Sequence, residues 1–75
     1  MTQYEVAYRY VGVLDESAMR ALDSVREVYG IRRISVSETE RMVRVEFDAS
    51  RLKEPVVSAL LRRAGIDLAE RLVLA

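Results

Sequence analysis

The strongest constraint on the fold of this chain is the order in which its hydrophobic periodicity changes. Residues 3–11 alternate between apolar and polar side chains with period two, which predicts a strand with one buried face. Residues 18–29 repeat apolar side chains at spacings of three and four, which predicts an amphipathic helix that Asp15 caps and Gly30 ends. The strand is expected to bury Tyr4, Val6, Tyr8 and Tyr10, and the helix is expected to bury Ala18, Ala21, Leu22, Val25, Val28 and Tyr29.

The second half of the chain adds two alternating segments, a second helical segment and a final apolar segment. Residues 31–36 and 43–47 alternate on either side of a polar turn at Ser37 to Glu40, which predicts a hairpin. Pro55 suits the first turn of a helix. The apolar positions of this helix are Val57, Leu60, Leu61 and Ala64. A short strand from Leu68 to Ala75 is expected to follow.

The order strand, helix, strand, strand, helix, strand within 75 residues predicts one α+β domain, residues 1–75, with the ferredoxin-like β-α-β-β-α-β architecture. Right-handed crossovers place both helices on one face of a four-stranded antiparallel sheet and leave its other face open to water. The residues expected on the open face are Glu5, Ala7, Arg9, Val11, Arg33, Ser35, Ser37, Arg44, Glu46 and Arg71. Because their charges have mixed signs, we expect cross-strand pairs on a solvated surface.

Composition excludes several classes of function. The chain has no cysteine and no histidine, so it lacks thiolate ligands, a thiol nucleophile and an imidazole base. We therefore expect no metal site, no catalytic residue and no cofactor, and hence a protein that is not an enzyme. Twelve basic residues balance twelve acidic ones, so no net field draws the chain to nucleic acid or to an anionic membrane.

The same sequence gives expectations for location and for RNA binding. No apolar stretch approaches the roughly 20 residues that span a bilayer, and residues 1–5 do not resemble an export signal. With no cysteine in the chain, a cytoplasmic location is expected. The tyrosines of residues 3–11 would stack on RNA bases only from the open face of the sheet, and Val6 in the same row favours burial instead.

Four segments resemble heavy-metal-associated domains, the modules of copper chaperones and metal ATPases. They are Gly12 to Ala18 between the first strand and first helix, Gly30-Ile31 with Ile34 to Val36, Val45 to Leu52, and Ala64 to Asp67. The resemblance implies the ferredoxin-like fold and, in the family, a metal loop with two cysteines. Those positions would fall on Asp15 and Ala18, or on Leu14 and Ser17, and neither pair binds Cu(I) or Zn(II) as two thiolates do.

A second resemblance is to ACT-type regulatory domains, through the Gly12 to Leu14 loop and the run from Gly30-Ile31 to Glu40. It implies a dimer that binds an amino acid or another small ligand at its interface.

Two hypotheses therefore stay open. One is a non-catalytic module that contacts a protein partner or a second copy through its outer strands and through a candidate interaction loop, Gly12, Val13, Leu14, Asp15, Glu16 and Ser17. The other is a small-ligand sensor.

Overall fold

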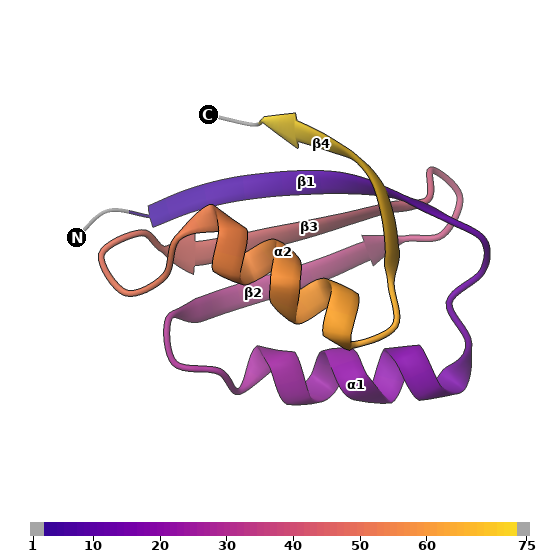
Figure 1. Ribbon diagram of the computed structural model, residues 1–75, viewed down its shortest axis with the longest axis horizontal. Helices are drawn as coiled ribbons and strands as arrows, with labels where there is room; N and C mark the ends of the chain where they lie inside the picture. Colours follow the sequence, from indigo (N-terminus) through magenta and orange to yellow (C-terminus); the bar gives the residue numbers. More distant parts are fainter. Residues whose placement is uncertain (1–2, 74–75) are drawn as a thin grey trace.

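The computed structural model describes residues 3–73, and Figure 1 shows them coloured along the sequence. These residues form six elements in the predicted order. The elements are β1 (Gln3–Val11), α1 (Glu16–Arg26), β2 (Ile31–Ser37), β3 (Met42–Asp48), α2 (Glu54–Arg63) and β4 (Asp67–Val73). The predicted final strand reached Ala75, and Leu74 and Ala75 lie outside the described residues.

The strands form one antiparallel sheet in the order β2-β3-β1-β4, so β1 and β3 are central and β2 and β4 are edges. Tyr8 of β1 lies opposite Val43 of β3, and Val6 lies opposite Val45, so these four side chains share one face. Both helices pack on that face (Figure 1) and the other face is left open. The predicted ferredoxin-like sandwich is confirmed.

The core lies between the sheet and the two helices. Its largest fully buried side chains are Phe47, Leu22, Leu61, Ile66, Val43, Val45 and Val57. Val6, Tyr8 and Tyr10 are buried as predicted, whereas Tyr4, which was expected in the same buried row, is 57% exposed. The Tyr4 ring meets Phe47 edge-on with 6.1 Å between ring centroids.

Helix α1 starts as predicted and ends earlier than predicted. Asp15 caps it, with a side-chain oxygen that accepts a hydrogen bond from the amide of Ala18 at 2.8 Å. The apolar spacing predicted a helix through Tyr29, but the helix ends at Arg26 and Tyr29 is 72% exposed. The chain turns there because Gly30 has a φ of +102° and the amide of Ile31 donates to the carbonyl of Val28. Tyr29 therefore points outward.

Strand β4 also differs from the sequence prediction at one position. Arg71 was expected on the open face, but it lies opposite Tyr8 and therefore faces the helices. The reason is a register shift, because Arg9 pairs with Glu70 while the next residue, Tyr10, pairs with Leu68. The extra residue in β4 reverses the alternation of every side chain that follows it.

Candidate functional site

The candidate interaction loop joins β1 to α1 at one end of the sheet (Figure 1). Gly12 has a φ of +84°, a conformation that side-chain-bearing residues rarely adopt. Val13 follows with 85% of its surface exposed, and Val11 just before the turn is 59% exposed. Leu14, in contrast, is buried in the core cluster. The loop is therefore anchored by Leu14 and presents Val13 to solvent, next to the exposed Val11 at the end of β1.

The two carboxylates of the loop are engaged within the chain. Asp15 caps α1 through the amide of Ala18, as described above. Glu16 accepts a hydrogen bond from Arg20 at 2.7 Å, one turn along the exposed side of α1. Ser17 is exposed in the first turn of the helix. The two carboxylates thus support the start of the helix, where negative charge is favoured.

The loop does not fit a soft metal ion. The two pairs of positions that correspond to family cysteines offer one carboxylate and one methyl group, or one isobutyl group and one hydroxyl. Cu(I) prefers thiolate or thioether sulfur, and Zn(II) sites need several thiolate, imidazole or carboxylate ligands. Within residues 3–73 there is no cluster of three or more metal-binding side chains. The residues of this loop therefore do not support metal binding.

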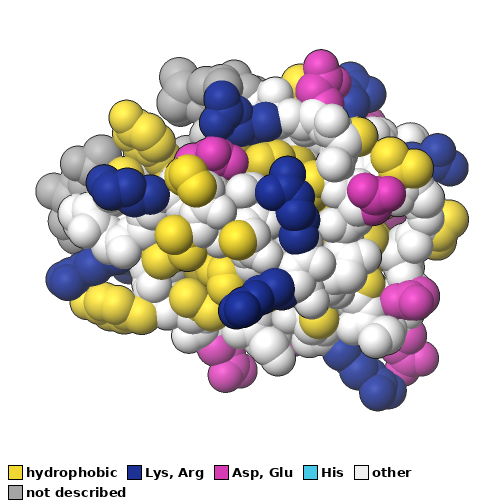
Figure 2. All heavy atoms as spheres, viewed as in Figure 1, with side chains coloured by type: hydrophobic (Ala, Val, Ile, Leu, Met, Phe, Trp, Pro, Cys, Tyr) yellow, Lys and Arg dark blue, Asp and Glu magenta, His cyan; other side chains and the backbone are white. Residues whose placement is uncertain are grey.

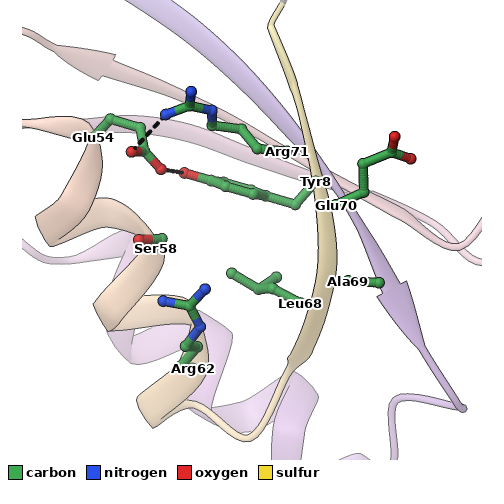
Figure 3. Close-up of a pocket in the computed structure, with 8 residues that line it drawn as sticks. All are labelled: Tyr8, Glu54, Ser58, Arg62, Leu68, Ala69, Glu70 and Arg71. Carbon is green, nitrogen blue, oxygen red and sulfur yellow. Dashed lines mark hydrogen bonds and ion pairs between the residues drawn. The ribbon is translucent and has the colours of Figure 1, made fainter.

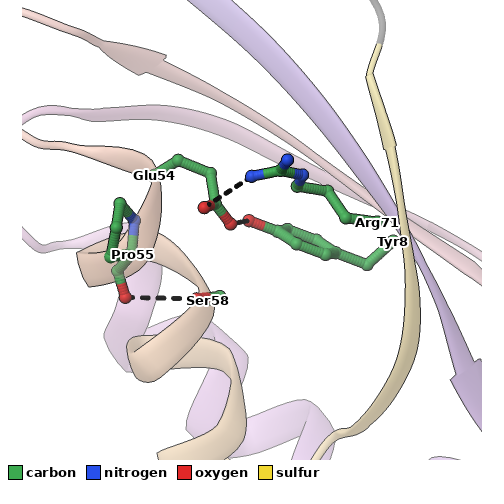
Figure 4. Close-up of polar contacts among 5 residues, drawn as sticks. All are labelled: Tyr8, Glu54, Pro55, Ser58 and Arg71. Carbon is green, nitrogen blue, oxygen red and sulfur yellow. Dashed lines mark hydrogen bonds and ion pairs between the residues drawn. The ribbon is translucent and has the colours of Figure 1, made fainter.

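A second feature, which sequence reasoning missed, is a polar cluster between α2 and β4 (Figure 4). The hydroxyl of Tyr8 donates to Glu54 at 2.6 Å, and Arg71 donates to the other oxygen of the same carboxylate at 2.9 Å. Burial, reinforced by the bond to Glu54, raises the pKa of the Tyr8 hydroxyl above its ordinary range. The cluster fastens the first turn of α2 to the two strands beneath it.

These groups line an open groove of about 380 Å³, shown in Figure 3. Its lining residues are Tyr8, Glu54, Ser58, Arg62, Leu68, Ala69, Glu70 and Arg71. The two hydroxyls in the groove already donate to acceptors, that of Tyr8 to Glu54 and that of Ser58 to the carbonyl of Pro55 at 3.1 Å. The carbonyl that accepts from Ser58 cannot act as a base, and the Glu54 carboxylate that accepts from Tyr8 is also bound by Arg71.

The sequence signal for this cluster was hidden by the irregularity in β4. Tyr8 and Glu54 are 46 residues apart, and their contact depends on how α2 crosses the sheet. Arg71 joins them only because the extra residue in β4 turns its side chain toward the helices. A single sequence gives no direct indication of such a shift.

A third polar feature closes β3 and opens the connection to α2. One oxygen of the buried Asp48 accepts hydrogen bonds from the amide of Ser50 at 2.9 Å and from its hydroxyl at 2.6 Å. The hydroxyl bond, followed by the amide bond, lowers the pKa of Asp48. This segment is part of the family-like run from Val45 to Leu52, and its observed role is structural.

The open face of the sheet carries the predicted cross-strand pairs. Arg9 lies 3.5 Å from Glu70, and Arg44 lies 3.6 Å from Glu5. Ala7, between these pairs, is fully buried by its neighbours. On the helix-bearing face, Figure 2 shows basic and acidic side chains interspersed, without a large region of one sign.

No family model matches the sequence, and no curated protein sequence matches it. Solved structures do match. The HMA domain of the copper chaperone for superoxide dismutase, in its apo form, is 21% identical, covers 99% of this chain and 72% of its own, and gives a TM-score of 0.77. The fold is that of the heavy-metal-associated domains. Oxidized MerP from Ralstonia metallidurans CH34 is 16% identical over 92% of this chain and 97% of its own, with a TM-score of 0.74.

A third structure, the yeast copper transporter domain Ccc2a, is 17% identical over 92% of this chain and 94% of its own, with a TM-score of 0.72. Identities this low establish the fold and not the activity. The present chain has this fold without a cysteine anywhere in its sequence. Within residues 3–73, no helix is both long enough and apolar enough to cross a membrane.

Proposed function

We propose that this chain is a non-catalytic interaction module that uses the heavy-metal-associated fold without a metal. Its main contact surface is the loop Gly12–Ser17, which binds a partner protein. The observation that carries the proposal is the exposure of Val13 and Val11, 85% and 59%, at the loop where thiolate ligands are missing. One structural neighbour is a chaperone named for the protein that it serves, which supports this fold as a protein-binding scaffold.

The loop is built to present these side chains in one position. The burial of Leu14 and the cap at Asp15 fix the loop on its helix side, and the pairing of Val11 with Asp67 of β4 fixes it on its strand side. A fixed loop loses little conformational entropy when it binds. Full burial of one valine side chain contributes about 1.5 kcal/mol or more, so two valines on either side of one turn supply a useful part of an interface.

The experiment compares two variants in which an exposed valine is replaced by aspartate. Val13→Asp places a charge in the proposed contact, whereas Val56→Asp places one on α2, where the valine is 46% exposed. Partners are captured by cross-linking in the native host and quantified by mass spectrometry, with circular dichroism as a check of folding. We expect Val13→Asp to lose the partners that wild type and Val56→Asp both retain. Equal capture by all three chains would contradict the proposed surface.

Metal independence has its own test. Titration with Cu(I) and with Zn(II) against a chelating competitor should show no binding in the submicromolar range, because the loop offers no soft ligand pair. Tight binding of either ion would overturn this part of the proposal. The cytoplasmic location expected from the sequence stays part of the proposal and is checked by fractionation of the native host.

The alternative of an amino-acid sensor stays a prediction. The groove beside Tyr8 is of a size that holds a small ligand, and Arg62 and Glu70 give it both charge signs. Against this, Glu54 and both hydroxyls are already paired within the chain. A thermal-shift screen against the amino acids decides, because a ligand that prefers the folded state raises the melting temperature.

A further inference from the structure

We propose that β2 pairs with β2 of a second copy, in antiparallel orientation, so that the two sheets become continuous. This inference goes beyond the proposed function because it uses an edge of the sheet and not the loop Gly12–Ser17. It starts from the strand order, in which β2 has a partner on one side only. An edge strand of this kind presents unpaired backbone groups that a further strand can use.

The backbone groups available on β2 can be identified. The amide of Asp48 donates to the carbonyl of Gly30, and β2 then pairs with β3 in steady register from Arg33 to Ser37. The carbonyl of Ile34 accepts a hydrogen bond at 3.2 Å from Arg26, a side chain of α1, and so it points away from β3. Residues two apart in a strand point their backbone groups the same way. Ile34 and Val36 therefore both face outward.

One antiparallel register uses both of these residues. When Ile34 lies opposite Val36 of the second copy, each residue exchanges its amide and carbonyl bonds with the other, and the two-fold axis passes at Ser35. The side chains near the axis are small serine hydroxyls that are exposed or partly buried. The contact is isologous and closes after two copies, so it gives a dimer and not a fibre.

Charge favours the same arrangement. Arg33 and Glu40 take part in none of the salt bridges found within residues 3–73. Glu40 lies beside Ser37, because its amide approaches the Ser37 hydroxyl at 3.4 Å and both residues line one small depression. In the proposed register Arg33 faces Ser37 of the second copy, and hence Glu40 of that copy. A parallel arrangement would instead place Arg33 beside Arg33.

The other edge of the sheet is less suited to pairing. Both edge strands contain an extra residue, and such irregularities twist an edge away from further strands. In β2 it is Arg32, which lies before the segment Arg33–Ser37 used in the proposed pairing, whereas in β4 it is Ala69, near the middle of the strand. At β2 the competing group is Arg26, whose side chain is 39% exposed and must release the Ile34 carbonyl before a second strand binds. This competition weakens the dimer, because Arg26 and the second strand compete for the same carbonyl of β2.

The test uses charge reversal and rescue, with sedimentation over a wide range of concentrations. Arg33→Glu and Glu40→Arg should each weaken dimerisation by about tenfold or more, because each places like charges together. An equimolar mixture of the two variants should restore a heterodimer, since the carboxylate introduced in one chain then meets the guanidinium introduced in the other. Arg63→Glu, on an exposed position of α2, is the matched control and should dimerise like wild type.

Two further measurements keep the result unambiguous. Arg26→Ala should tighten the dimer, and the amide of Val36 should exchange more slowly with deuterium as concentration rises. A wild-type chain that stays monomeric together with a monomeric Arg26→Ala chain would overturn the inference, and so would a mixture that fails to rescue. Val13→Asp should leave the dimer intact, so that failure of the edge contact and failure of the loop contact are told apart.

Discussion

The Tyr8 hydroxyl connects β1 to the start of α2 through its bond to Glu54. Tyr8→Phe keeps the ring in the core and removes this bond, leaving the carboxylate with Arg71 alone. Hydrogen bonds to charged groups are worth about 1.5 kcal/mol or more, so we expect a loss of about 1.5 kcal/mol in the free energy of unfolding. Urea denaturation measures this change.

Tyr10→Phe provides the comparison for that experiment. Tyr10 is also buried, but its hydroxyl makes none of the side-chain hydrogen bonds found within residues 3–73. Its replacement should change stability by less than the roughly 1.5 kcal/mol expected for Tyr8→Phe, because no hydrogen bond to a charged group is lost. A loss of equal size in both variants would show that the bond to Glu54 adds no stability.

Ser50 controls the ionisation of Asp48. Its hydroxyl and its amide both donate to one oxygen of the Asp48 carboxylate, and they favour the charged form. Ser50→Ala removes the hydroxyl bond, which is the larger cause of the lowered pKa. The pKa of Asp48 should therefore rise toward its ordinary value of 3.8, as followed by NMR titration of the carboxyl carbon. An unchanged pKa of Asp48 would mean that the Ser50 hydroxyl does not cause the lowered value.

Single residues also mark where sequence reasoning reached its limit. The buried positions of Val6, Tyr8 and Tyr10 follow from alternation alone and were predicted. Arg71 was placed on the wrong face because one extra residue in β4 reverses the alternation, and nothing in the local sequence reports it. The bond from Arg71 to Glu54 was missed for the same reason, since it forms only when Arg71 faces the helices.

The turn between α1 and β2 packs directly against the loop that leads into α2. A Cβ at Gly30 would lie 2.9 Å from a side-chain carbon of Leu52 and 3.0 Å from the Cβ of Arg51, and Gly30 also has a positive φ. At Gly12 the φ is positive but no atom lies within 4 Å of the added carbon. Substitution at Gly12 therefore causes backbone strain alone, whereas substitution at Gly30 causes backbone strain and a steric conflict.

Alanine substitution at these two turns tests that distinction. Gly12→Ala should cost about 1 to 2 kcal/mol, the strain of a left-handed conformation. Gly30→Ala should cost about 1 to 3 kcal/mol more, because the neighbouring loop must also move. Chemical denaturation of both variants gives the comparison. Equal losses would mean that the turn at Gly30 and the loop at Leu52 are not packed together in solution.

The boundaries of the elements were predicted where a cap or a turn residue marks them. Asp15 gave the start of α1 correctly, because a carboxylate before an apolar spacing is a local signal. The end of α1 was placed too late, since Val28 and Tyr29 continue the spacing although the chain has already turned toward β2. The candidate loop was located in the same local way. The burial of Leu14 beside exposed Val13 was not foreseen, because a loop has no periodicity.

The side chains of this protein titrate either at acid pH or at alkaline pH. The sequence has no histidine and no cysteine, so no side chain has an ordinary pKa between those of the carboxylates and those of tyrosine and lysine. Folding stability should therefore change little between about pH 5 and pH 9. Outside this range Asp48 and Tyr8, the two groups within residues 3–73 whose pKa is shifted, act at opposite ends of the scale.

The change in folding stability at alkaline pH follows from Tyr8. Its pKa is raised in the folded chain, so the folded state holds the proton more tightly than the unfolded state, whose tyrosines titrate near 10. The stabilisation is complete below that pH and is lost as the pH rises above it. Tyr8→Phe should flatten this decline. Urea denaturation at a series of alkaline pH values measures the slope for wild type and for the variant.

The loss of folding stability at acid pH follows from Asp48, whose pKa is shifted in the opposite direction to that of Tyr8. Its pKa is lowered in the folded chain, so its stabilisation is complete above the ordinary value of 3.8 and is lost as the pH falls below it. Ser50→Ala should make the acid decline shallower while leaving the alkaline decline unchanged, and Tyr8→Phe should do the reverse. Because the two groups lie in different parts of the fold, a double variant should show both changes independently. Any coupling between them would mean that the Asp48 turn and the Glu54 cluster move together through the short segment that joins them.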